Sequence, residues 1–450
     1  MTSPNRYDVT DWPVGSPAED IGEVINSIIA DVKSRQTESD HLGGKPGAVI
    51  YLPPGDYRLR TQVKIDISFL KIQGSGHGFT SSSIRFNVPE SEWPDLHELW
   101  PGGSRIVVDI PHGKDAEQAA GAAFYVERDG SPRISSIEFS NFCLDGLHFE
   151  SDGSGLNAEN SYVNGKTGIY VASPNDSIRI NEMGFVYLEH AVTIFNADAL
   201  SIHDNFLAEC GNCIELRGWG QASKITDNLV GAGFNGHSIY AQNHGGLLIC
   251  ANNVFPRGAS SVHLDGVTRS SVTNNRLHSF YPEMVRLVDS SENLVGSNHL
   301  LRDLEPWTPF IGVDNGSDDL SGLLTVSGSN NSIIGNHISE VIDSGAIRPA
   351  GATPVIIRLA SGTGNYISSN HVVAIDSRAV IGDSAFAAQV DALLATGTSA
   401  ALSVTTVLVD PGSTRNTILD SGRDEQVSLD RERNAFRSTP SVGAEPDPVG

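Results

Sequence analysis

The chain has 450 residues, with 54 acidic and 30 basic side chains and a formal net charge of −24 at pH 7. Hydrophobic residues make up 39% of the chain and charged residues 19%, which is enough apolar material for a core and excludes global disorder. The acidic excess argues against nucleic acids and anionic membranes as partners, because both attract basic surfaces. A neutral substrate such as a sugar is compatible with this charge.

The start of the chain is polar, and no run approaches the ~18 apolar residues of a membrane span. We therefore expect a cytoplasmic protein without a signal peptide, or a secreted one whose leader has been removed. The four cysteines are too few for a disulfide scaffold. Cys210 and Cys213 form one C-x-x-C pair without a second pair at metal spacing, so buried strand cysteines are favoured over a zinc or redox site.

The first predicted elements precede the repeats. Residues 20–35 place apolar side chains at helical spacing, so we expect a helix that caps the open end of the core. Residues 47–57 predict a strand, a Pro-Gly turn and a second strand. Segment 87–104 is typical of a loop laid over a surface, where Trp93 and Trp100 can stack on a sugar ring, form part of a lid or serve as buried anchors.

A short pattern then recurs: an apolar residue, two spacers, asparagine, often with histidine or another asparagine beside it, and a further apolar residue. The asparagines stand 22 to 25 residues apart and later 38 and 34 residues apart, at Asn205, Asn228, Asn253, Asn275, Asn298, Asn336 and Asn370. This period, with short β-branched runs, predicts a parallel β-helix in which each repeat forms one coil. Asparagine at one turn of every coil can stack and satisfy backbone groups that the bend leaves unpaired. A leucine-rich repeat would need a leucine consensus, and a β-sandwich would show no fixed period.

A second strand of the repeat has a polar or aromatic residue between aliphatic ones, at Tyr170, Thr193, Glu215, Tyr240, His263 and Arg286. Because side chains alternate across a strand, the aliphatic neighbours should fill the coil and these six residues should form one outward row. Such a row is suited to binding carbohydrate. The alternative is an ordinary solvated face.

Beyond the repeats, residues 422–450 are charged, contain Pro and Gly and have no period, so we expect a loose tail. The predicted organisation is an N-terminal segment with the capping helix (1–46), a single β-helix domain (47–421) and the tail (422–450).

Several segments resemble known proteins. The turn P-P-G-D-Y (53–57) followed by asparagine-marked coils resembles the pectin-lyase-like parallel β-helices, which act on polysaccharides. A closer resemblance, to the inulin fructotransferase family, is carried by S-P-N-R-Y-D-V-T (3–10), N-G-K-T-G-I (164–169), G-F-V-Y-L-E-H-A (184–191), A-E-C-G-N-C-I-E-L (208–216), N-N-V-F-P-R-G (252–258), N-R-L-H-S-F-Y-P (275–282) and P-A-G-A-T-P (349–354). The resemblance runs from the N-terminus to roughly residue 420.

The resemblance implies an all-β, right-handed parallel β-helix that assembles as a homotrimer, with active sites near subunit contacts and no metal or organic cofactor. Enzymes of the family release a difructose anhydride from the end of inulin by intramolecular attack, and close relatives hydrolyse the anhydride to inulobiose. The family's catalytic Asp and Glu are 11 residues apart and match Asp204 and Glu215 of this chain.

Two carboxyl groups suit this chemistry. Cleavage of a fructofuranosyl bond passes through an oxocarbenium-like transition state, so one group protonates the leaving oxygen and the other activates the attacking hydroxyl or stabilises charge. We assign the acid/base role to Glu215, an unusual residue in mid-strand, and the role of base, nucleophile or charge stabiliser to Asp204. Half a coil separates them, so they should share one rung on neighbouring faces. The alternative for Asp204 is a structural turn residue, as at Asp227.

Other substrate-binding candidates each have a plainer alternative. His263 and Arg286 can bind fructose hydroxyls, or they can be solvated or interface residues. Asn164 and Lys166 can contact substrate, or they can hold a turn.

Three functions follow from these patterns. A cytoplasmic enzyme would meet a small imported anhydride rather than an extracellular polymer, which favours hydrolysis of difructose anhydride III to inulobiose. The alternative is an inulin fructotransferase that releases difructose anhydride I or III from inulin. The third is a non-catalytic β-helix that binds carbohydrate or serves as an adhesin.

Overall fold

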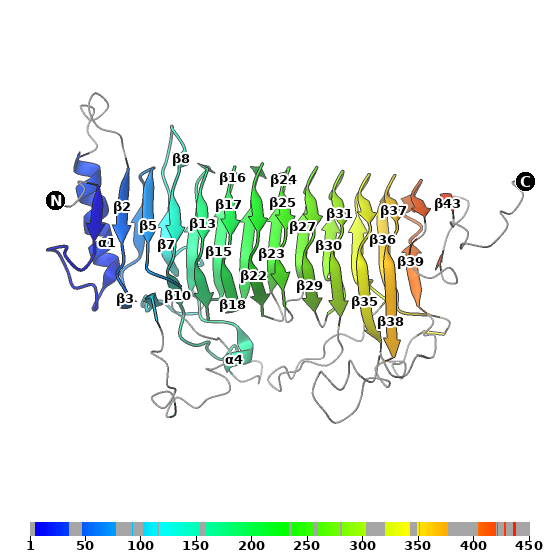
Figure 1. The fold of residues 1–450 in the computed structure, drawn as a ribbon, viewed down its shortest axis with the longest axis horizontal. Coiled ribbons are helices and arrows are strands. Elements are labelled where there is room, and N and C mark those ends of the chain that lie inside the picture. The colour runs from blue at the N-terminus through cyan, green and yellow to red at the C-terminus, as the bar shows by residue number, and fades with distance from the viewer. Residues whose placement is uncertain are drawn as a thin grey trace, which may run out of the picture. The chain divides into compact units, whose positions relative to one another are not determined.

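The computed structural model describes residues 5–35, 47–77, 92, 102–114, 117–153, 158–233, 236–255, 260–279, 281–302, 320–342, 349–350, 352–376, 404–419, 421, 427–428 and 435–437. The chain divides near residue 258 into two compact units. Each unit is built from parallel sheets to which the chain returns once per coil (Figure 1).

In the first unit, helix α1 (Ile21–Arg35) forms where the sequence predicts it. Asp20 caps its N-terminus, since its Oδ1 accepts the amide hydrogen of Gly22 at 3.0 Å. The apolar face of the helix is buried, through Ile21, Val24, Ile25, Ile28, Ile29 and Val32. It packs against the first strands of the unit, β2 (Ala48–Tyr51), β3 (Gly55–Leu59) and β4 (Val63–Ile65). The predicted capping helix and the predicted strand–turn–strand are both confirmed.

The described residues of the first unit form four parallel sheets. Its first sheet consists of β1 (Arg6–Asp8), β2, β5 (Leu70–Gln73), β9 (Glu138–Ser140), β13 (Arg179–Asn181), β17 (Ser201–His203), β21 (Lys224–Thr226) and β25 (Leu248–Cys250). Its second consists of β3, β6 (Ser104–Val108), β10 (Cys143–Asp145), β14 (Gly184–Val186), β18 (Phe206–Cys210), β22 (Leu229–Ala232) and β26 (Asn253–Val254). Its third consists of β4, β7 (Ala122–Val126), β11 (Thr167–Val171), β15 (His190–Phe195), β19 (Asn212–Arg217) and β23 (His237–Gln242). The short fourth consists of β8 (Ile134–Ser135), β12 (Asn175–Asp176), β16 (Ala197–Asp198), β20 (Gly220–Gln221) and β24 (His244–Gly245), and helix α4 (Ala158–Ser161) precedes β11.

In the second unit, the part of the chain that the structure describes repeats this plan with three long sheets. The first consists of β28 (Ser271–Thr273), β31 (Leu294–Gly296), β34 (Ser332–Ile334), β37 (Tyr366–Ser368), β41 (Thr417–Leu419) and β43 (Ala435–Arg437). The second consists of β29 (Arg276–Ser279), β32 (His299–Arg302), β35 (His337–Ile342) and β38 (His371–Asp376). The third consists of β27 (Ser260–Asp265), β30 (Val285–Val288), β33 (Leu324–Ser327), β36 (Val355–Thr363), β39 (Thr405–Val409) and β42 (Val427–Ser428), and β40 (Ser413–Thr414) pairs with β36.

Consecutive strands of the chain enter successive sheets, and each strand pairs in parallel with its counterpart one coil away. Ile180 of β13, for example, is opposite Phe139 of β9 and Ile202 of β17. Because the same side of every strand faces inward, the coil is filled by aliphatic and aromatic side chains, among them Phe124, Ile169, Val192, Ile214, Leu216 and Ile239. This arrangement is a parallel β-helix, as the period of the sequence predicts.

The predicted asparagine ladder exists, with one correction. Asn205 donates from its backbone nitrogen (3.0 Å) and from Nδ2 (2.9 Å) to Oδ1 of Asn228, and Asn228 bonds in the same way to Asn252. The prediction of Asn253 for this coil is wrong, because the ladder residue is the one directly before the strand of the second sheet. Asn253 is itself the first residue of β26.

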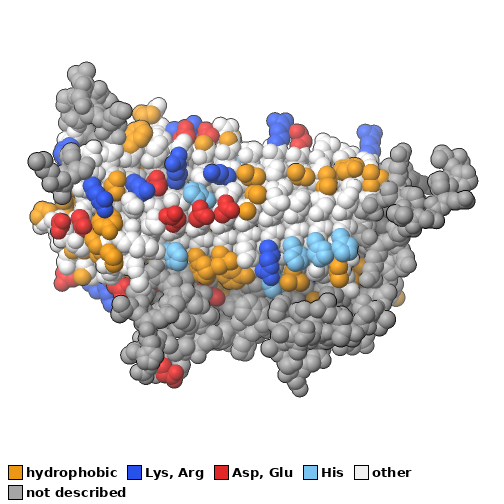
Figure 2. Space-filling view, viewed as in Figure 1, with side chains coloured by type: hydrophobic (Ala, Val, Ile, Leu, Met, Phe, Trp, Pro, Cys, Tyr) orange, Lys and Arg blue, Asp and Glu red, His pale blue; other side chains and the backbone are white. Residues whose placement is uncertain are grey.

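In the second unit the ladder continues through Asn275, Asn298, Asn336 and Asn370. A further ladder, which the sequence analysis missed, joins Asn293, Asn331, Asn365 and Asn416. Parallel register also stacks histidines: His299, His337 and His371 are opposite one another with ring centroids 5.0 Å apart, and Figure 2 shows histidine side chains gathered in a row.

Within the predicted tail, β42 and β43 pair in parallel with β39 and β41. The predicted boundaries at residues 46 and 421 stay a prediction. Among the described residues, no helix has both the length and the apolar composition that crossing a membrane requires.

Candidate active site

The predicted outward row lies in register along the third sheet of the first unit. Thr193 is opposite Tyr170 of the preceding coil and Glu215 of the next. Glu215 is in turn opposite Tyr240. Thr193 and Glu215 are fully buried even though they point away from the coil interior. Their neighbours on the outer face cover them, so this part of the row is an enclosed polar cluster and not a solvated surface.

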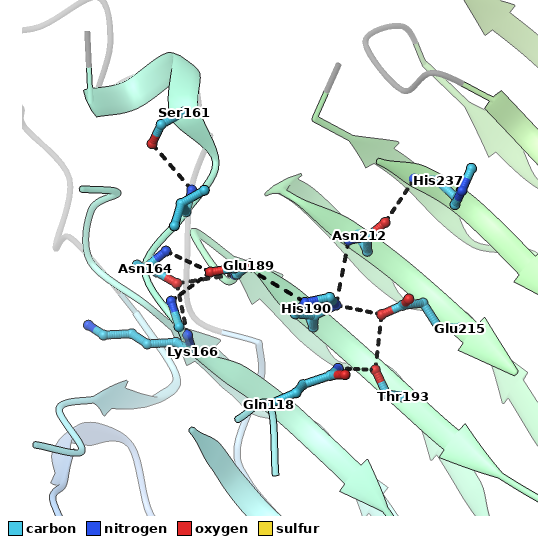
Figure 3. Close-up of polar contacts among 12 residues, drawn as sticks. Gln118, Ser161, Asn164, Lys166, Glu189, His190, Thr193, Asn212, Glu215 and His237 are labelled. Carbon is cyan, nitrogen blue, oxygen red and sulfur yellow. Dashed lines mark hydrogen bonds and ion pairs between the residues drawn. The ribbon is translucent and has the colours of Figure 1, made fainter. Parts of the chain in front are cut away.

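Glu215 is the centre of this cluster (Figure 3). Its Oε2 accepts a hydrogen bond from Thr193 Oγ1 at 3.0 Å and lies 2.6 Å from Nδ1 of His190. Its Oε1 accepts from Nε and Nη2 of Arg217 at 3.2 and 2.5 Å. Thr193 Oγ1 accepts in turn from Gln118 Nε2 at 2.6 Å. Both carboxylate oxygens therefore face donors.

Opposing effects set the pKa of Glu215. Burial alone would raise the pKa, because a charged carboxylate loses its hydration. The hydrogen bond and charge of His190, followed by the charge and hydrogen bonds of Arg217, outweigh burial and lower the pKa from 4.5 to about 2. Glu215 is therefore an anion at neutral pH. In this ionised form Glu215 can act as a base or stabilise a positive charge. To act as an acid, it must first receive a proton from a neighbouring group.

His190 lies between two carboxylates. Its Nδ1 faces Glu215, and its Nε2 is 3.9 Å from Oε1 of Glu189. The other oxygen of Glu189 accepts backbone amide hydrogens from Asn164 (2.9 Å) and Gly165 (2.6 Å). These bonds hold the carboxyl group of Glu189 in place beside the imidazole. The His190 side chain is 19% exposed, so the imidazole borders the surface while Glu215 does not.

Asn164 and Lys166 hold the turn that leads into β11. Asn164 is buried, its Nδ2 donates to the carbonyls of Tyr187 (2.8 Å) and His148 (3.0 Å), and its Oδ1 accepts the amide hydrogen of Lys166 at 3.1 Å. Lys166 Nζ donates to the carbonyl of Gly146 at 2.7 Å. Burial lowers the pKa of Lys166, and nearby carboxylates partly offset this effect. Both residues therefore support the site through the backbone that carries Glu189.

Aromatic rings flank the cluster on either side. Tyr170 stacks on Tyr125, with ring centroids 5.9 Å apart, and is half-buried. The guanidinium carbon of Arg217 lies 5.1 Å from the ring centroid of Tyr240. Aromatic faces beside buried polar groups are suited to a sugar ring, which presents apolar C–H faces and polar hydroxyl edges.

Asp204 lies elsewhere on the coil. It follows β17 at the corner between the first and second sheets, has a left-handed backbone (φ 57°) and a side chain that is 58% exposed. Its Oδ2 is 2.8 Å from Nδ1 of His203. Asp227 occupies the same corner of the next coil, with φ 58°. Asp204 and Glu215 belong to one coil, and strand β18 of the second sheet lies between them along the chain. No hydrogen bond joins these two described residues, and their predicted placement on neighbouring faces stays a prediction.

The remaining candidates lie in the second unit or outside the described residues. His263 is opposite Arg286 in β27 and β30, and Arg286 pairs with Glu283 at 3.2 Å. The row is thus in register in this unit as well. Trp93 and Trp100 lie outside the described residues.

Cys210 and Cys213 are buried strand residues with free thiols, as predicted, and burial raises the pKa of the Cys213 thiol. Within the part of the chain that the structure describes, no group of three or more His, Cys, Asp or Glu side chains is arranged to hold a metal ion.

Sequence reasoning missed His190, Glu189 and Arg217. A signal for Arg217 existed, since it is two residues after Glu215 and strand alternation puts both on one face. His190 had no such signal, because alternation breaks at the start of β15, where Ala191, Val192 and Thr193 are all buried.

Comparisons with known proteins agree with this architecture. A family model described as the β-helix repeat of inulin fructotransferase matches residues 297–440. The chain is 44% identical over 384 residues to the DFA-I-forming inulin fructotransferase of Arthrobacter globiformis, a match that covers 84% of this chain and 91% of that protein. It is also similar to crystal structures of DFA-IIIase from Arthrobacter chlorophenolicus A6. The complex with DFA-III is 76% identical with a TM-score of 0.90 and covers 98% of this chain and 99% of that one. The complex with GF2 is 75% identical with a TM-score of 0.90 and covers 98% and 100%.

Proposed function

The chain belongs to the inulin fructotransferase family of enzymes that act on fructofuranosyl linkages, and we propose that it hydrolyses difructose anhydride III to inulobiose. The observation that carries this proposal is the 76% identity, across nearly the whole chain, to a DFA-IIIase whose structure contains DFA-III. The cluster around Glu215 supplies groups that this hydrolysis needs.

In the proposed reaction, Glu215 and Asp204 are the two carboxyl groups. Glu215 is the acid/base group: as an anion held by His190 and Arg217, it stabilises the oxocarbenium-like transition state and takes a proton from the attacking water. Asp204 supplies the second carboxylate. Tyr170 and Tyr240 flank the sugar rings on either side of Glu215.

The second candidate reaction is intramolecular fructosyl transfer, which releases a difructose anhydride from inulin. It is favoured by the 44% identity to a protein named as a DFA-I-forming inulin fructotransferase. Both reactions break the same class of bond, and they differ in whether water or a fructose hydroxyl attacks C2.

Product analysis separates the two. The protein is incubated with difructose anhydride III and, separately, with inulin, and the products are resolved by anion-exchange chromatography. We expect inulobiose from the anhydride and no action on inulin. Anhydride released from inulin would replace the hydrolase proposal by the transferase, and no product from either substrate would contradict both.

We also propose that the enzyme acts as a homotrimer in which Asp204 of one subunit completes the site around Glu215 of another. The support is that the two carboxyl groups lie in different sheets of one chain and one of them is exposed. Light scattering gives the mass of the assembly. Co-expression of Asp204→Asn and Glu215→Gln subunits should restore activity that neither variant has alone, and an inactive mixed assembly would contradict a shared site.

A further inference from the structure

The surroundings of His190 suit a residue that holds a proton and passes it on. Its two ring nitrogens face the carboxylates of Glu215 and Glu189, at 2.6 and 3.9 Å. When the imidazole is protonated, both of its nitrogens are donors, and each carries a hydrogen toward one of these carboxylates. The ring borders solvent, so it can exchange protons with water.

Glu215 cannot hold the proton itself in the resting site. Its Oε1 accepts from Arg217, and its Oε2 accepts from Thr193 and faces His190. These contacts use both oxygens as acceptors, and the pKa of about 2 keeps the Glu215 carboxyl group ionised at neutral pH. Cleavage of a fructofuranosyl bond nevertheless needs a proton for the leaving oxygen. The nearest titratable group that can supply one is His190.

We propose that His190 is a positioning residue that stores the proton which Glu215 delivers to the leaving oxygen. This inference rests on the proposed function. As the C2–O bond breaks with its electron pair going to oxygen, a proton passes from His190 Nδ1 to Glu215 and from Glu215 to that oxygen. Water then attacks C2, its proton returns through Glu215 to His190, and a new C2–O bond forms. One water is consumed, and the His190–Glu215 pair ends as it began.

The charged and titratable groups around His190 determine how its protonation responds to pH. Glu189 precedes it in the chain, and Glu215 and Arg217 come from β19. Lys166 precedes β11 and accepts the His190 amide hydrogen with its backbone carbonyl at 3.1 Å, while its ammonium group points to Gly146. His237 of β23 is on the far side of Asn212, whose Oδ1 accepts its amide hydrogen. The ring nitrogens of His190 therefore face two acidic groups, Glu215 and Glu189, and the guanidinium of Arg217 bonds to the first of these.

The experiment is the pH dependence of kcat/KM for the wild type, His190→Gln and Glu189→Gln. His190→Gln keeps a hydrogen-bond donor toward Glu215 but removes the stored proton. We expect kcat/KM to fall about 100-fold and the alkaline limb of the profile to disappear. In Glu189→Gln the imidazole loses one favourable charge, so the alkaline limb should move to lower pH. A His190→Gln enzyme that is slower but keeps both limbs would overturn the proposal, because that is the result of a structural role alone.

A second measurement is independent of turnover. In protein labelled with ¹³C at the histidine ring, the His190 signal is identified by its absence in His190→Gln. At the pH at which the protein is most stable, the His190 signal should be that of a protonated imidazole in the wild type. In Glu215→Gln it should be that of a neutral imidazole. A neutral His190 in the wild type would overturn the inference. If the wild type acts on neither substrate, the proposed function fails while this titration still decides the state of the pair.

Discussion

The two carboxyl groups of the family motif lie in opposite environments. Glu215 is fully buried in the middle of β19, and side chains of β15 and β19 bond both of its oxygens. Asp204 is exposed at a corner of the coil, with a left-handed backbone and one neighbouring imidazole. This chain alone sets the charge state of Glu215. The charge of Asp204 is screened by water while the residue is exposed, so its chemistry depends on whether another group covers this corner.

The largest expected effect is that of Glu215→Gln. The substitution keeps the size of the side chain but removes the negative charge that faces His190 and Arg217. We expect kcat/KM to fall about 1,000-fold on the natural substrate, with a cooperative thermal transition retained. The control is Glu292→Gln, an exposed carboxylate paired with Arg269 in the second unit, which should leave turnover unchanged. Turnover of Glu215→Gln within tenfold of the wild type would refute the role of Glu215.

The next effect tests whether Asp204 differs from its structural counterpart. Asp204→Asn removes the charge at a corner where asparagine tolerates the left-handed backbone, so the fold should be unaffected. We expect kcat/KM to fall about 100-fold. Asp227→Asn changes the same corner of the next coil and is the matched control. Equal losses in both variants, or none in either, would show that Asp204 is a turn residue.

A smaller effect follows from the pKa of Glu215. Because its folded-state value of about 2 is below the ordinary 4.5, Glu215 stabilises the fold above pH 4.5, and this contribution is lost as the pH falls from 4.5 toward 2. Arg217→Gln removes one of the groups that lower the pKa, so acid unfolding should begin at a higher pH. Circular dichroism between pH 2 and 6 measures the midpoint. His203→Gln, beside the exposed Asp204, should leave the midpoint where it is; an unmoved midpoint in Arg217→Gln would argue against the assigned ion pair.

The contrast between the two carboxyl groups also shows which structural features can be predicted from the sequence. The period predicts the coil, and strand alternation predicts the row that contains Glu215, because both depend on local geometry that repeats. The doublet Asn252–Asn253 left the ladder ambiguous by one residue, and bonding to Asn228 resolves it. The contrast in burial between Asp204 and Glu215 depends on the side chains that cover each position, and the place of His190 depends on the break in strand alternation at the start of β15. Neither property has a periodic signal in the sequence.

The smallest expected effect concerns the corner that carries Asp204. Asn205 donates from Nδ2 to the carbonyl of Ile180 at 3.0 Å, and its Oδ1 accepts the amide hydrogen of Met183 at 3.0 Å. Asn205→Ala leaves these buried groups unpaired, which should lower the free energy of unfolding by about 1–3 kcal/mol in urea titrations. Asn253→Ala, at an exposed strand position outside the ladder, should change it by less than about 0.5 kcal/mol. Turnover in Asn205→Ala should fall only a few-fold, because the ladder positions the backbone of Asp204 and does not touch Glu215. An equal loss of stability in both variants would contradict the ladder, whereas a loss of activity as large as that of Asp204→Asn would mean that corner geometry, and not charge, is what Asp204 contributes.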